Sequence, residues 1–138
     1  MGRTVLAVVA GLVVALLAMV SVEFLALQLW PPPPGFVLED EADLARLVEL
    51  ATPAKKAAVV FGWALASFLG GWVAARVSHR HRTGAAVAIG VLVVAGVVFN
   101  AANIPHPMWM NVLGVLLPVP MALLAARLAT KRAAPAAA

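Results

Sequence analysis

Cysteine is absent from this sequence, and charged residues are scarce. Without cysteine, the chain cannot form disulfides, a thiol nucleophile, or a Cys-ligated metal or iron–sulfur centre. Only 12% of the 138 residues are charged, which is about half the fraction found in a typical soluble domain. In contrast, 64% of the residues are hydrophobic, and the mean hydropathy is +1.00. These proportions predict an integral membrane protein that has the lipid bilayer as its surroundings.

Four apolar segments approach or exceed the length of about 20 residues that a membrane-spanning helix needs. They cover residues 4–30, 57–77, 84–103 and 108–129. None shows the polar–apolar alternation of an outer-membrane strand, and the first is too long for the core of a signal peptide. The sequence therefore predicts an all-α fold, a membrane-embedded four-helix bundle. We expect one domain over residues 1–132 and a disordered tail at 133–138.

Basic residues flank the apolar segments unevenly. Seven of the ten Lys and Arg residues fall on one predicted side of the membrane: Arg3, Arg76, Arg80, Arg82, Arg127, Lys131 and Arg132. The segment between the first two spans carries most of the acids. The positive-inside rule therefore predicts that both termini face the cytoplasm. These basic residues flank the apolar segments and do not gather on one soluble face. We therefore expect no nucleic-acid partner, despite a pI near 10.8.

The loop between the first two spans has features of its own. Four prolines, residues 31–34, cannot continue a helix and favour a stiff, extended exit from the membrane. The sequence EDEADLARLVEL then places acids at its start and Leu44, Leu47 and Val48 on one face. We expect a short amphipathic helix in this external loop, which either lies on the membrane surface or caps the bundle. The alternative is a mobile acidic loop.

Small residues recur at helix-packing intervals in the second span. They are Gly62, Ala66, Gly70 and Ala74, with Gly71 adjoining. Inside lipid, such residues let two backbones approach closely, so we expect helix packing on this face. Trp63 is interpreted as a packing or lipid-facing residue. In the fourth span, Pro118 and Pro120 each remove a backbone hydrogen bond and predict a kink.

Polar side chains and one acid gather in the outer half of the predicted bundle. They are Glu23, Gln28, Asn100, Asn103, His106 and Asn111. Polar side chains that faced lipid independently of one another would not be expected to lie in the same half of the membrane. We therefore predict that these side chains face inward and form a buried polar cluster.

Glu23 is the acid within a predicted span, where a charge near the bilayer centre costs about 2.5–3.5 kcal/mol on insertion scales. One interpretation is a neutral glutamate that hydrogen-bonds to Asn100 or Asn103 and holds helices together. A second is a proton-responsive or cation-binding carboxylate in a water-filled vestibule open to the outside. A third is contact with a partner subunit or a lipid headgroup.

Residue arrangements typical of catalysis are not found. The sequence has no Ser–His–acid order, P-loop or metal-ligand spacing. His106 stands between two prolines, and no histidine lies within a span to complete the ligation of a haem. His79 and His81 alternate with arginines in a short turn, which favours contact with lipid phosphates or a topological role over a metal site. We therefore expect no enzymatic activity, no catalytic residues, no cofactor and no metal.

Several motifs extend over most of the chain: WPPPPG, GWALASFLGGWVAAR, NAANIPHPMWM and LLPVPMALLAARLA. Together they resemble a group of small, uncharacterised bacterial four-helix integral membrane proteins. The resemblance implies four spans and a bacterial cytoplasmic (inner) membrane location, and it transfers no catalytic residue. The small multidrug transporters share only four helices and a glutamate in the first helix. Glu23 lies too far along its helix, and the charge bias is too strong, for that family.

Two functions from different classes fit these observations. The first is a non-enzymatic structural or accessory subunit of a membrane assembly, which packs against itself or against other membrane proteins. The alternative is a small proton- or cation-coupled transporter that uses Glu23, with Asn100, Asn103 and Asn111 lining the site. An assembly or envelope-stress factor acting through the acidic outer helix is not distinguished from the first function by sequence.

Overall fold

The structure is a computed structural model that describes residues 2–37 and 39–131. Four helical stretches in it are long and apolar enough to cross a membrane, as predicted for an all-α four-span protein. The fourth stretch is divided into two helices, and a further short helix lies in the first loop. The helices are α1 (Gly2–Leu29), α2 (Glu41–Leu50), α3 (Pro53–Val77), α4 (Arg82–Asn103), α5 (Met108–Leu116) and α6 (Pro118–Lys131).

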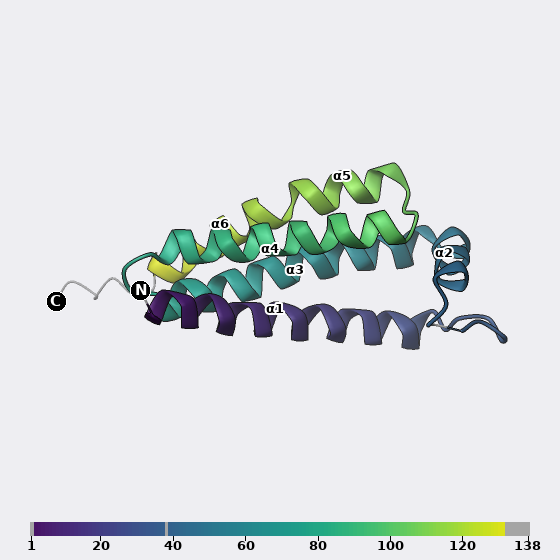
Figure 1. Ribbon diagram of the computed structural model, residues 1–138, viewed down its shortest axis with the longest axis horizontal. Helices are drawn as coiled ribbons and strands as arrows, with labels where there is room; N and C mark the ends of the chain where they lie inside the picture. The colour runs from purple at the N-terminus through teal and green to yellow at the C-terminus, as the bar shows by residue number, and fades with distance from the viewer. Residues whose placement is uncertain (1, 38, 132–138) are drawn as a thin grey trace.

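The long helices run side by side, and α3 is the central one (Figure 1). It packs against α1, α4 and α6, whereas α1 makes most of its contacts with α3 alone. The start of α1, the turn between α3 and α4, and the end of α6 lie at one end of the bundle. Because α2 lies across the opposite end, the two ends differ in both structure and charge.

The second span begins at Pro53, four residues earlier than predicted. The side chain of Thr52 accepts a hydrogen bond from the backbone N–H of Lys55 at 3.3 Å and caps this helix. Pro53 occupies the first helical turn, where its missing N–H is not needed. The Lys55 ammonium group then donates to the carbonyl oxygen of Trp30 at 3.1 Å. This lysine therefore links the start of α3 to the residue that directly follows α1.

All five predicted small packing residues of α3 are buried. They serve two different neighbours, because Gly62 and Gly70 face α1 whereas Gly71 faces Ala122 of α6. Close packing on two sides makes α3 the most buried of the spanning helices. A side chain at any of these three glycines would meet a neighbouring helix within 3.1 Å. The small residues therefore set the spacing of the whole bundle.

The fourth span is interrupted at Leu117, as expected from its two prolines. Pro118 and Pro120 have no N–H to donate to the carbonyls four residues earlier. Hydrogen bonds continue across the interruption, from Leu117 to Leu113 at 2.9 Å and from Met121 to Leu117 at 3.0 Å. The interruption is therefore a kink in a continuous span rather than a loop.

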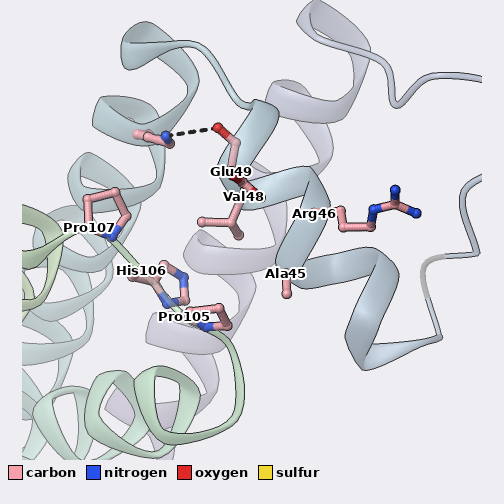
Figure 2. A pocket seen from close by; sticks show the side chains of 8 residues that line it. Ala45, Arg46, Val48, Glu49, Pro105, His106 and Pro107 are labelled. Carbon is pink, nitrogen blue, oxygen red and sulfur yellow. Dashed lines mark hydrogen bonds between the residues drawn. The ribbon is translucent and has the colours of Figure 1, made fainter.

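The amphipathic helix α2 caps the end of the bundle opposite the start of α1, one of the two predicted positions (Figure 1, Figure 2). Asp40 caps its first turn by accepting from the N–H of Ala42 at 3.0 Å, and Asp43 accepts from the N–H of Val37 at 2.9 Å. Gly35, with φ of +93°, allows the preceding chain to reverse direction. The apolar residues Leu44, Leu47 and Val48 face the bundle residues Leu27, Val59, Ile104 and Met110.

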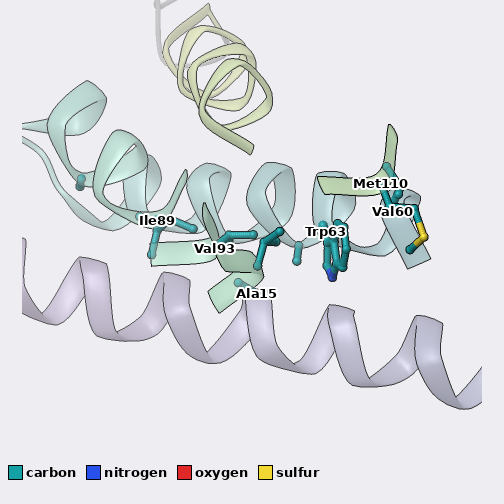
Figure 3. Close-up of a cluster of buried hydrophobic side chains, with 10 residues drawn as sticks. Ala15, Val60, Trp63, Ile89, Val93 and Met110 are labelled. Carbon is teal, nitrogen blue, oxygen red and sulfur yellow. The ribbon is translucent and has the colours of Figure 1, made fainter. Parts of the chain in front are cut away.

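The core contains few large side chains. Trp63 of α3, Ile89 and Val93 of α4, and Met110 of α5 lie in one line along the bundle axis (Figure 3). Most remaining buried positions are alanine or glycine, and the others are Val60, Ser67, Ser78, Val97 and Pro118. Because the lipid outside is as apolar as the core, close backbone packing rather than burial of large apolar groups holds such a bundle together.

Candidate functional site

A groove of about 220 Å³ lies between α1 and α4, with Trp63 of α3 among its lining residues. Three of its lining residues, Glu23 of α1, Trp63 of α3 and Asn100 of α4, have side chains that carry polar groups. The remaining lining is apolar and comes from Leu12, Ala15, Leu16 and Met19 of α1 and Leu92, Val93, Gly96 and Val97 of α4. The side of the bundle thus carries a narrow apolar groove with a polar end.

The amino-acid sequence of α4 explains why this space is left unfilled. Near the end of the bundle where α1 begins, Ile89 packs against Gly11 and Gly70, so α1 and α4 are held together there. Further along α4, Gly96 contributes no side chain, and a Cβ at this position would have no atom within 4 Å. The groove therefore opens between a bulky contact at Ile89 and the polar residue Asn100.

Trp63 is buried, with only 3% of its surface exposed, so the structure selects the packing interpretation over the lipid-facing one. Its ring makes an edge-to-face contact with His106, with ring centroids 6.1 Å apart. Gly114 makes room for the ring, because a Cβ there would lie 2.7 Å from Cζ3 of Trp63. In Figure 3 the indole nitrogen points toward α1, on the side of the groove.

Glu23 is exposed at the rim of the groove, and Asn100 opposite it is half-buried. No hydrogen bond joins these two side chains in the part of the chain that the structure describes. This corrects the prediction that Glu23 is buried within the bundle. The carboxyl group faces the side of the molecule, and the four-span fold alone does not shelter it.

The other predicted polar residues do not join this pair, so the six do not form one buried cluster. Asn103 is exposed, and its amide donates to the carbonyl of Phe99 at 2.7 Å. Gln28 is also exposed, and it lies outside the groove because five residues of helix rotate it by roughly 140° from Glu23. Asn111 is half-buried on α5, and its buried Oδ1 has no hydrogen-bond partner among the residues that the structure describes.

His106 occupies a second hollow, of about 380 Å³, between α2 and the turn that joins α4 to α5 (Figure 2). Its Nδ1 lies 2.7 Å from the carbonyl oxygen of Ile104. Arg46, Glu49 and Lys56 are among the residues that line this hollow, although the guanidinium group of Arg46 points away from His106 (Figure 2). Because His106 also contacts Trp63, a chain of two aromatic rings connects this hollow beside α2 with the groove.

Trp63 lines the groove, although the sequence predicted only a packing or lipid-facing role for it. A signal was present, because Trp63 directly follows Gly62 and precedes Ala66 and Gly70 on the helix that packs most closely. A large aromatic residue within such a stretch needs a matching gap on a neighbour. Gly114 supplies that gap, but it lies 51 residues away in the sequence, so only the folded chain pairs them.

Together, the fold and the groove define a multi-pass integral membrane protein that carries an apolar groove with a polar end on its side. Comparison with known protein families, with curated proteins and with solved structures gives no match to this chain. The functional argument therefore depends on the geometry of the site.

Proposed function

We propose that this protein is a non-enzymatic accessory subunit of a membrane assembly, and that its α1–α4 groove receives a transmembrane helix of another subunit. The observation that carries the proposal is the exposed carboxyl group of Glu23 at the groove rim. Glu23 lies six residues before Leu29, the last residue of α1, which places it about 9 Å below the helix end. At that depth, a carboxyl group facing lipid is costly.

Charge complementarity identifies the chemistry of the partner. None of the groove-lining residues is a lysine or an arginine that could pair with Glu23. A partner helix that presents a basic, amide or hydroxyl donor would supply the missing hydrogen bond and exclude lipid from the carboxyl group. Gly96 and the exposed Leu16 and Leu92 provide an apolar surface beside Glu23, against which the partner helix would pack. The occupant is therefore a spanning helix with one polar residue at the level of Glu23.

The proposal includes a location and an orientation. We place the protein in the bacterial cytoplasmic (inner) membrane, with both termini in the cytoplasm, as a member of the four-helix group that its motifs resemble. The orientation is supported by Arg3, Arg76, Arg80 and Arg82, which lie at the end of the bundle opposite the acidic α2.

Site-directed photocrosslinking in native membranes tests the partner. A photoreactive side chain at Leu16, on the groove rim, should capture a partner peptide, whereas one at Val115, exposed on α5, should not. The adduct should map to a spanning segment with a polar residue, and Glu23→Leu should weaken it several-fold more than Glu23→Gln. Capture of a second copy would assign the groove to self-association. Equal adducts at both positions would contradict the proposal.

A proton- or cation-coupled carrier remains the second candidate function. It is favoured by one observation, the contact between Trp63 and His106 that connects the hollow beside α2 with the Glu23 groove. The structure reduces the predicted lining to Glu23 and Asn100, because Asn103 and Asn111 lie outside the groove. Purified protein in liposomes should then dissipate a pH gradient, and Glu23→Gln should abolish this flux while leaving the fold intact. Absence of flux in the unmodified protein would eliminate this candidate.

A further inference from the structure

A basic hollow of about 490 Å³ lies at the inner end of the bundle, far from the Glu23 groove. It is lined by Arg3 and Thr4 from the first turn of α1 and by His79, Arg80 and His81 from the turn between α3 and α4. Figure 1 shows this turn beside the start of α1. The hollow therefore joins two segments that are more than 70 residues apart in the sequence.

The positive charge of this hollow is not balanced nearby. All six acids of the chain lie between residues 23 and 49, and the nearest along α1, Glu23, is 20 residues, or about 30 Å, from Arg3. Two helix N-termini, those of α1 and α4, also lie at this end. At the start of α4, His81 supplies no side-chain cap, so the first backbone N–H groups add further positive potential.

The turn that carries the basic residues is held in place. Ser78 is buried; its N–H donates to the carbonyl of Ala74 at 3.0 Å, and its hydroxyl oxygen accepts from the N–H of His81 at 3.4 Å. The N–H of Ala85 donates to the carbonyl of His81 at 2.9 Å and continues the chain into α4. The basic side chains consequently extend from a fixed backbone rather than from a loose loop.

We propose that this hollow binds a phosphate group, with Arg3 and Arg80 as its principal ligands. A guanidinium group presents a planar pair of donors that matches phosphate oxygens. Thr4 also lines the hollow beside Arg3, and its hydroxyl group provides another donor. The hollow lies at the ends of spanning helices, which is the level of lipid headgroups. Exposed Val5 and Leu6 follow directly and would contact the acyl chains of a bound lipid. The same chemistry would also accept free inorganic phosphate.

Native mass spectrometry of the full-length protein in detergent tests this site with three probes: phosphatidic acid, phosphatidylcholine and inorganic phosphate. The double variant Arg3→Gln/Arg80→Gln should bind phosphatidic acid about 30-fold more weakly, since each basic residue near an anionic headgroup contributes roughly a fivefold factor. The matched control is Arg76→Gln/Arg127→Gln, which removes the same charge outside the hollow. Arg76 instead lies over the ring of Trp72, 4.9 Å from its centroid.

Each outcome decides the proposal. Binding of phosphatidic acid over phosphatidylcholine, lost only in the first double variant, supports a lipid site. Binding of inorganic phosphate with the same dependence supports a site for the phosphate group itself. Equal loss in both double variants, or no binding of phosphatidic acid or phosphate, overturns the proposal. If the double variant does not fold, Arg80→Gln alone changes one exposed side chain and should reduce binding about fivefold.

Discussion

Gly11 of α1 and Gly70 of α3 lie against each other reciprocally. A Cβ built on Gly11 would lie 2.6 Å from the carbonyl oxygen of Gly70, and a Cβ built on Gly70 would lie 2.6 Å from the carbonyl oxygen of Gly11. Neither residue therefore has room for a methyl group, and the obstacle on each side is backbone, which cannot rotate away. This pair fixes the crossing point of α1 and α3.

Gly70→Ala should lower the free energy of unfolding by about 1–3 kcal/mol, because the added methyl forces the two backbones apart. Unfolding in mixed detergent micelles, followed by circular dichroism, measures the change. Gly96→Ala is the matched control, since a Cβ there meets nothing within 4 Å. A Gly70→Ala protein as stable as the Gly96→Ala protein would show that α1 does not cross α3 at this point.

Gly114→Ala should displace the ring of Trp63, because the new methyl would lie 2.7 Å from both Cζ3 of Trp63 and Cγ1 of Val97. We expect a loss of about 1–3 kcal/mol in unfolding free energy. In a Trp63→Leu background, the same substitution should cost less, since a smaller side chain leaves space for the methyl. A double-mutant cycle gives the coupling, and strictly additive effects would contradict this contact.

Asp40→Ala should loosen α2 without disturbing the spanning helices. The substitution removes the acceptor for the N–H of Ala42 and should cost about 1 kcal/mol of local stability. Hydrogen exchange followed by mass spectrometry should show faster exchange in residues 41–50 and no change in α3. Glu39→Ala removes an equal charge from an exposed neighbour and should leave exchange unaltered. Equal exchange in the two variants would count against the cap.

Glu23 should react with a lipid-soluble carbodiimide from the side of the bundle, because its carboxyl group is exposed at the groove. Mass spectrometry of the α1 peptide measures the adduct, and Glu23→Gln should abolish it. Gly96→Leu would fill the groove and should reduce labelling several-fold. Gly84→Leu adds the same side chain outside the groove and should have no effect. Unchanged labelling in both leucine variants would place Glu23 away from this groove.

The sequence alone determined the number of spans, the helix in the first loop and the kink in the last span. Each follows from local chemistry: the length of an apolar run, acids at a helix start, and prolines that lack an N–H. The tertiary structure decided which polar residues meet. Small residues on two faces of α3 do not specify which neighbour each face receives, and helix rotation sets whether a side chain turns inward. For this reason Glu23 and Asn100 share a groove with Trp63, while Gln28 and Asn103 do not.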